Sequence, residues 1–266
     1  MSSDTRSTTT GAQQNVTSGG APDATSSDLA FVHERAARVR AESQVFARDQ
    51  VLSTASHDLR GPLNAIHTWA HVLERKLGEA DASIGRALAG IRAGVEQQVS
   101  LIEKIIDAPR MATRHLVIAR RPVGLEALCQ DAIANARLTQ GGGEIVLEWN
   151  GESREVSVDA ERIWQAWWCM LAYAHELAAA AADNAASLAA IGTPGTVRVL
   201  RVTTEQGNCI TTLTTAAPAL ERSVLEQNLA LPRRVAEAHG GQCSIEPHDE
   251  AGELSITMVI ALTSRD

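Results

Sequence analysis

Apolar residues in the first third of the chain recur with the spacing of a long helix. Gly61 and Pro62 are the only helix breakers between Leu29 and Leu77, and the remaining composition favours helix. A regular seam runs through this segment at alternating intervals of four and three residues: Leu52, Ser56, Leu59, Leu63, Ile66, Ala70, Leu73 and Leu77. That spacing predicts one face of a coiled coil or helical bundle, with a single polar position.

A second amphipathic helix is expected after a short break. Residues 78–82 should end the first helix, Ser83 can cap the second, and the second should stop near Pro109. Its apolar positions are Leu88, Ile91, Val95, Ile102 and Ile105. Two such helices form a hairpin that cannot cover its whole apolar stripe, whereas a four-helix bundle made with a second copy would cover it. The pattern therefore predicts a homodimer.

The second half of the chain alternates between short β patterns and helices. We expect helices at residues 125–138, 163–182 and 222–238, and strands at residues 144–149, 156–158, 196–203, 209–215 and 254–262. Asp159 or an adjacent residue should cap the long helix, and Gly240-Gly241 should end the last one. The expected fold class is α+β, a helical hairpin followed by a two-layer α/β sandwich. The expected divisions are a disordered tail at 1–28, a dimerisation domain at 29–112 and the sandwich at 113–266.

Composition narrows the classes of function. With 24 Lys+Arg against 32 Asp+Glu, the formal charge is −8, which repels nucleic acid and anionic lipid. Residues 1–28 contain no signal peptide or anchor, and the most apolar stretch, residues 166–182, is interrupted by His175 and Glu176. We therefore expect a soluble cytoplasmic protein. The cysteines lie far apart, and His67 and His71 lack an acidic third ligand in the local sequence, so no metal site is expected.

The most distinctive chemistry lies in the segment from Ser56 to Ile66. His57 follows a seam position, so it should point to the flank of the bundle, where a partner can reach it. A neutral imidazole can be phosphorylated on one ring nitrogen while the other is held by a hydrogen bond, which Asp58 is placed to accept. Pro62 should bend the helix beside the histidine. Taken alone, a single exposed histidine on a helix is more often a solvated surface residue.

The order of residues around His57 favours a functional histidine over a solvated surface residue. Ser56-His57-Asp58-Leu59-Arg60-Gly61-Pro62-Leu63 resembles the H-box of sensor histidine kinases, and the segment from Leu101 to Asp107 resembles the end of their second dimerisation helix. The resemblance spans roughly residues 50–110. It implies that His57 is the phosphoacceptor, that Asp58 orients it or acts as a general base, and that a partner docks on Arg60, Asn64 and His67. Gly61 stands where Thr or Asn commonly positions water, which argues against phosphatase activity.

The resemblance continues into the ATP-binding domain of these kinases, but the ligand residues differ. Residues 159–165 resemble the start of the N-box helix, and Cys169 and Tyr173 then stand in place of two asparagines, the second of which helps to hold Mg²⁺. Neither residue offers the neutral oxygen that magnesium prefers. The other replaced positions are Thr215, Ala217 and Ala219 in the Asp-x-Gly-x-Gly turn, and Glu226 and Asn228 in the second glycine-rich box. The resemblance therefore implies a degenerate domain with no bound cofactor.

Three hypotheses follow from these features. The first, which we favour, is a histidine phosphotransferase that relays phosphoryl groups between receiver-domain aspartates through His57 without ATP. The receiver domain of a response regulator would supply Mg²⁺ and the acidic residues. The second is a non-catalytic regulator that docks on a histidine kinase or a response regulator. The third is a divergent but active histidine kinase.

Overall fold

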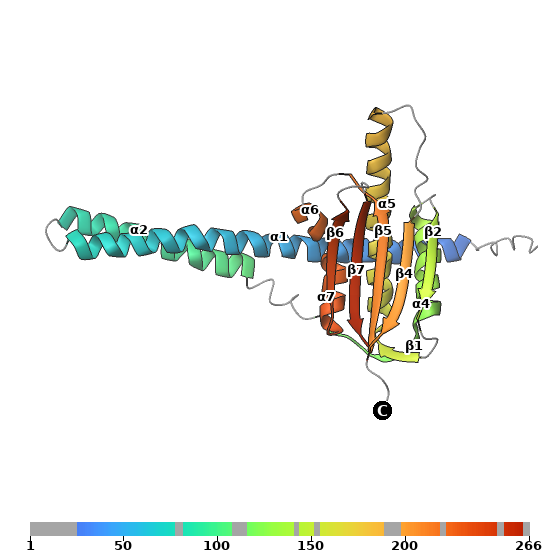
Figure 1. Ribbon diagram of the computed structural model, residues 1–266. Helices are drawn as coiled ribbons and strands as arrows, with labels where there is room; N and C mark the ends of the chain where they lie inside the picture. The colour runs from blue at the N-terminus through green and yellow to red at the C-terminus, as the bar shows by residue number, and fades with distance from the viewer. Residues whose placement is uncertain are drawn as a thin grey trace, which may run out of the picture.

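The computed structural model describes residues 26–77, 82–107, 116–140, 144–151, 155–188, 198–218, 222–248 and 253–262. Two long helices begin the described chain (Figure 1). Helix α1 (Ser26–Leu77) is continuous over 52 residues and contains Pro62 without ending there. Helix α2 (Ala82–Ile102) runs beside its second half and passes into a π-helical turn, η1 (Glu103–Asp107). The predicted hairpin is confirmed, although α1 begins slightly before Leu29, and most of the predicted tail lies outside the described residues.

The seam of the hairpin is only half covered within one chain. Alternate seam positions pack together, with Leu63, Val95 and Ile102 forming a small buried cluster. The seam positions between them, Leu59, Ile66 and Leu73, remain exposed. A two-helix hairpin has this property because its stripe is wider than the contact between its two helices. The exposed positions are those that a second hairpin would bury.

The remaining chain forms an α/β sandwich built on a five-stranded sheet. The sheet order is β2 (Ile145–Asn150), β4 (Arg198–Glu205), β5 (Asn208–Ala216), β7 (Glu253–Ala261) and β6 (Gln242–His248). Only β2 and β4 are parallel, and a separate pair joins β1 (Arg121–Gly124) to β3 (Glu155–Val158). Figure 1 shows α4 (Leu125–Gln140), α5 (Ala160–Leu188) and α7 (Ala230–Ala238) on one face of the sheet. The predicted fold class is thus confirmed.

Three local expectations for this region were wrong. The single helix expected at 222–238 is two, α6 (Arg222–Gln227) and α7, because Pro232 lacks the N–H that a continuous helix would need and suits a first turn instead. Strand β6 was missed because it is an edge strand containing Pro247, and only Cys243 and Ile245 mark its apolar side. Strand β1 was missed because two of its four residues are Pro122 and Gly124, which argue against a strand.

Helix α5 begins at a polar junction that joins several elements. Asp159 accepts hydrogen bonds from the backbone N–H of Arg162 at 3.1 Å and of Ala119 at 2.7 Å, which confirms it as the cap. Its own N–H donates to Nε2 of the buried His239 at 3.2 Å, while Nδ1 of that histidine lies 2.8 Å from the carbonyl of Val235. Burial lowers the pKa of His239, so the imidazole is neutral in this junction.

The first half of α1 belongs to the core of the sandwich. We call residues 26–50 the arm. Its apolar residues Ala36, Val39 and Phe46 are buried in the same cluster as α5 and the sheet (Figure 1). One helix therefore serves two cores, with the arm on the sandwich and the second half in the hairpin. Among the described residues, no helix has the length and apolar character needed to cross a membrane.

Candidate functional site

His57 projects from the second half of α1 into solvent. Its side chain is 91% exposed, and Nδ1 lies 3.3 Å from Oδ1 of the neighbouring Asp58. When Nδ1 carries the proton and donates it to that carboxylate, the lone pair of Nε2 faces solvent. His57 is thus accessible, with the Asp58 carboxylate beside its Nδ1, and their roles as phosphoacceptor and orienting acid stay predictions.

A carboxylate from the other end of the hairpin fixes the helix on both sides of His57. The hydroxyl of the buried Ser56 donates to Oδ1 of Asp107 at 3.1 Å, and the guanidinium of Arg60 pairs with Oδ2 of the same residue. Asp107 lies in η1, the turn that ends the second helix. We did not predict these two contacts of Asp107 from the sequence. Two signals were present: Ser56 is the lone polar seam position, and the family-like segment ends at Asp107.

The predicted docking residues share one face of α1 with His57. Arg60, Asn64 and His67 follow it at helical intervals of three and four residues, so the four side chains form a row. Asn64 is exposed, His67 is half-buried, and Arg60 is turned toward Asp107. That a receiver domain contacts this row stays a prediction.

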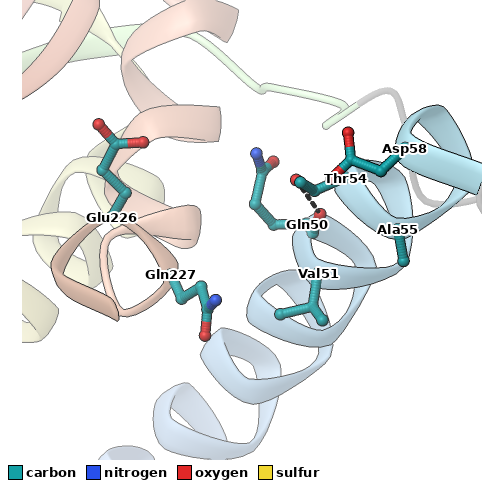
Figure 2. A pocket seen from close by; sticks show the side chains of 7 residues that line it. All are labelled: Gln50, Val51, Thr54, Ala55, Asp58, Glu226 and Gln227. Atoms are coloured by element: carbon teal, nitrogen blue, oxygen red, sulfur yellow. Dashed lines mark hydrogen bonds between the residues drawn. The ribbon is translucent and has the colours of Figure 1, made fainter. Parts of the chain in front are cut away.

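A pocket of about 380 Å³ opens beside Asp58, between α1 and α6 (Figure 2). Its α1 wall carries Gln50, Thr54 and Asp58, and its α6 wall carries Glu226 and Gln227. Glu226, one of the predicted degenerate positions, thus faces the helix that bears His57, and it pairs with Arg233 at 3.8 Å. Val51 and Ala55 also line the α1 wall, and each wall carries one carboxylate, Asp58 on α1 and Glu226 on α6. Carboxylates on both sides disfavour an anionic ligand such as a triphosphate.

Three other predicted positions of the degenerate site meet in a second, smaller cavity. Cys169, Tyr173 and Asn228 line a space of about 160 Å³ between α5, the α6–α7 turn and the arm. Burial raises the pKa of the Cys169 thiol to about 12, although a hydrogen bond with Ser43 of the arm opposes the shift. Burial also raises the pKa of Tyr173. Both groups are therefore neutral at physiological pH, and neither is a ligand for Mg²⁺.

The remaining predicted positions serve the core or lie outside the described residues. The Thr215 side chain is buried, and its hydroxyl donates to the carbonyl of Ala174 on α5 at 3.2 Å. Ala217 is partly buried against the main core, and Ala219 is outside the described residues. Thr215 therefore acts as a strand-to-helix contact, which its position at the end of β5 allows.

Metal-ligating side chains are not clustered in the part of the chain that the structure describes. No group of three or more His, Cys, Asp or Glu there is arranged to hold a metal ion. In the predicted histidine pair, Nδ1 of His71 lies 3.7 Å from Oε2 of Glu74. All four cysteines are buried thiols.

Comparison with known proteins places these features in a family context. Residues 47–114, which include His57 and Asp107, match the His Kinase A (phospho-acceptor) domain. The chain is 26% identical over 116 residues to the probable sensor histidine kinase TcrY of Mycobacterium tuberculosis, a match that covers 44% of this chain and 24% of that protein. The chain thus spans about a quarter of the length of this curated relative.

A solved structure extends the likeness beyond the helical hairpin. The crystal structure of a histidine kinase from Burkholderia phymatum is 27% identical, with a TM-score of 0.62, and the match covers 87% of this chain and 99% of that one. The likeness therefore includes the α/β sandwich as well as the hairpin. The chain accordingly carries a histidine-kinase core, in which a HisKA phosphoacceptor domain is followed by an ATPase-like α/β domain.

Proposed function

We propose that this chain is a histidine phosphotransferase of a two-component phosphorelay, in which His57 exchanges phosphoryl groups with receiver-domain aspartates without using ATP. The single observation that carries the proposal is a contrast in exposure. His57 is 91% exposed within a match to the phosphoacceptor domain, whereas Cys169 and Tyr173, at the nucleotide positions, are buried.

The chemistry requires only a nucleophile and its orientation from this chain. The lone pair of His57 Nε2 attacks the phosphorus of the aspartyl phosphate, an N–P bond forms, and the P–O bond to the aspartate breaks. The aspartate leaves as a carboxylate, and the positive charge on the imidazole is stabilised by Asp58 beside Nδ1. The receiver domain provides Mg²⁺ for the charge on the transferring group.

Two features of the chain weigh against ATP as the phosphoryl donor. The residues at the magnesium positions are a thiol and a phenol, and the nearby Glu226 would repel a triphosphate. The cavity at Cys169 also lies against Ser43, fourteen residues before His57 on the same helix. At a rise of about 1.5 Å per residue, that spacing separates the cavity from the phosphoacceptor of the same chain by roughly 20 Å.

The exposed half of the hairpin seam supports a homodimeric relay. HisKA domains dimerise and act with response regulators. Leu59, Ile66 and Leu73 are exposed in one chain and stand at the spacing that a second hairpin would bury. In such a dimer the row from His57 to His67 lies on the outside of the bundle, where a receiver can dock.

The test is phosphoryl transfer from a panel of labelled phospho-receivers to the purified chain, with its His57→Ala variant beside it. His71→Ala is the matched control, because it removes another exposed histidine from the same helix. We expect acid-labile label on the wild type and on His71→Ala, and none on His57→Ala. A parallel reaction with Mg²⁺ and labelled ATP alone should leave all three proteins unlabelled.

The other outcomes distinguish the alternative functions. Label acquired from ATP in that parallel reaction would identify a divergent active kinase. Absence of label from every receiver, together with retained receiver binding by His57→Ala, would identify a non-catalytic docking regulator. Either result would replace the relay.

A further inference from the structure

We infer that the arm of α1 is the resident occupant of the α5 face that carries Cys169 and Tyr173, and that it keeps this face closed to nucleotide. The inference rests on the proposed function in one respect, because it takes these two residues as the positions at which a kinase of this fold would meet ATP. The arm itself, and the contacts that seat it, are independent of that assignment.

Apolar packing seats the arm. Ala36 and Val39 are 1% exposed, and Phe46 is also buried, all within the cluster formed by α5 and the sheet. The indoles of Trp164 and Trp168 on α5 are fully buried beneath this contact. Removing the arm would expose both indoles to water, and keeping such large apolar side chains out of water favours the seated arm. The arm is therefore part of the folded domain.

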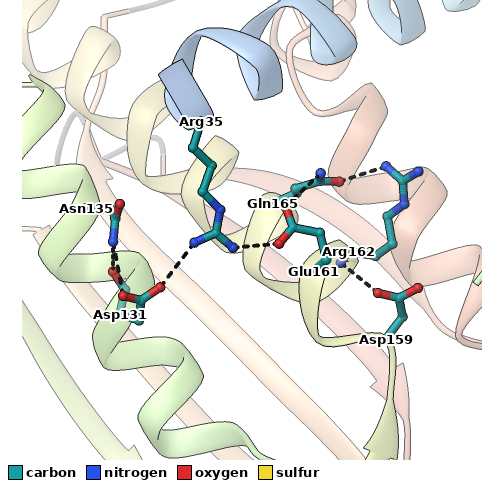
Figure 3. Close-up of polar contacts among 7 residues, drawn as sticks. All are labelled: Arg35, Asp131, Asn135, Asp159, Glu161, Arg162 and Gln165. Carbon is teal, nitrogen blue, oxygen red and sulfur yellow. Dashed lines mark hydrogen bonds and ion pairs between the residues drawn. The ribbon is translucent and has the colours of Figure 1, made fainter. Parts of the chain in front are cut away.

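Charged contacts fix the position of the arm on α5. Figure 3 shows Arg35 of the arm reaching between Asp131 of α4 and Glu161 of α5, at 3.4 Å and 2.6 Å. The same guanidinium lies 3.4 Å from the ring centroid of Trp164, a cation–π contact. Farther along the arm, Arg40 lies 5.0 Å from the ring of Trp168. A non-specific helix contact would not combine ion pairs and stacked guanidinium groups at successive turns.

A further ion pair continues this contact toward the start of α5. Arg162 pairs with Glu42 of the arm at 2.6 Å. Its guanidinium also donates to the side-chain oxygen of Gln165 at 2.8 Å (Figure 3). Each of these side chains is partly buried. The arm is therefore held over the first turns of α5 from both flanks.

The arm also lines the cavity that contains Cys169 and Tyr173. Arg40, Ser43 and Gln44 form one side of the cavity that Cys169 and Tyr173 line on the other. The cavity measures about 160 Å³, whereas ligand sites typically measure about 300–1,000 Å³. Ser43 of the arm and Cys169 of α5 line this cavity together. A nucleotide can enter here only when the arm leaves.

Cys169 provides a direct reporter of the arm. In a full-length background with Cys129, Cys209 and Cys243 changed to Ala, the rate at which a thiol reagent modifies Cys169 measures exposure of the α5 face. Val39→Asp places a carboxylate in the buried contact, and Val45→Asp makes the same change at a position of the arm that is 50% exposed. We expect Val39→Asp to raise the rate by about tenfold or more through opening of the contact, and Val45→Asp to leave it near the background rate. Equal rates of Cys169 modification in the background protein, Val39→Asp and Val45→Asp would overturn the inference.

A covalent lock tests the arm without destabilising the domain. Ser43→Cys in the same background should form a disulfide with Cys169 on mild oxidation, because the two residues line the same small cavity, one from the arm and one from α5. Failure to form that bond would overturn the inference. Binding of a fluorescent ATP analogue with Mg²⁺ is then measured for each protein. Binding to the locked protein would show that nucleotide does not need the face that the arm covers, and would also overturn it.

These outcomes separate the arm from the proposed relay. If the analogue binds Val39→Asp and not the locked protein, the arm is the barrier, and the residues at the nucleotide positions are more competent than proposed. If no receiver phosphorylates His57 while the lock forms and Cys169 stays protected, the relay fails and the inference about the arm stands.

Discussion

Asp107 should determine the stability of the helix that presents His57. Its carboxylate accepts the hydrogen bond of Ser56 and pairs with Arg60, the residues that stand on either side of His57. Asp107→Ala removes both interactions at once and leaves the Ser56 hydroxyl, whose side chain is 1% exposed, without this acceptor. The variant is therefore expected to destabilise the hairpin next to His57.

The size of the effect follows from the burial of the two partners. Leaving a buried hydroxyl without its acceptor costs about 1–3 kcal/mol, and loss of a half-exposed ion pair costs up to about 1 kcal/mol. We therefore expect Asp107→Ala to lower the free energy of unfolding by about 1–4 kcal/mol. Asp107→Asn keeps an oxygen for Ser56 and should lose only about 1 kcal/mol. Glu103→Ala, an exposed change in the same turn, should stay within about 0.5 kcal/mol of the wild type.

Urea unfolding followed by circular dichroism measures these differences, and a double-mutant cycle isolates the pair. Ser56→Ala combined with Asp107→Ala should cost less than the sum of the two single changes, because the hydroxyl that lost its acceptor is then absent. The reasoning would be refuted if Asp107→Ala matched Glu103→Ala, or if the double-mutant cycle gave no coupling.

Three further predictions concern glycines, a buried histidine and the seam. Gly90→Ala should stabilise α2 by about 0.5–1 kcal/mol, because its new methyl group meets nothing within 4 Å. Gly241→Ala should instead lower the melting temperature, because its Cβ would lie 1.9 Å from the carbonyl oxygen of Val259. Burial lowers the pKa of His239 below its ordinary value of about 6.5. The stability that the neutral imidazole contributes is therefore complete above about pH 6.5 and is lost as the pH falls through the lowered pKa. The free energy of unfolding of His239→Gln, measured in urea, should accordingly vary less between about pH 7 and 5 than that of the wild type. Ile66→Asp puts a charge on the uncovered seam and should convert the dimer into monomers in sedimentation velocity, whereas a monomeric wild type would contradict the expected bundle.

Local patterns were sufficient for the helical half of the molecule. The alternating spacing from Leu52 to Leu77 predicted the hairpin correctly, because side chains at those intervals lie on one face of any α-helix. The same spacing placed His57 on an accessible flank, and the resemblance of the surrounding residues to the H-box implied phosphoryl transfer. In the second half, the periodic core strands β4, β5 and β7 were predicted, whereas β6 was not, because an edge strand has few apolar residues to mark it.

Contacts between distant segments were decided by the tertiary structure. The polar seam position at Ser56 and the segment ending at Asp107 are visible in the sequence, but their pairing is not, because the distance between them closes only when α2 folds back along α1. Nothing in the arm indicates that Val39 and Phe46 pack on α5, more than 100 residues away, rather than continuing the hairpin seam. An amphipathic helix encodes only which face will be buried. What buries that face depends on which surface the rest of the chain brings to it, and here that surface is the indoles of α5, over which Arg35 and Arg40 of the arm lie.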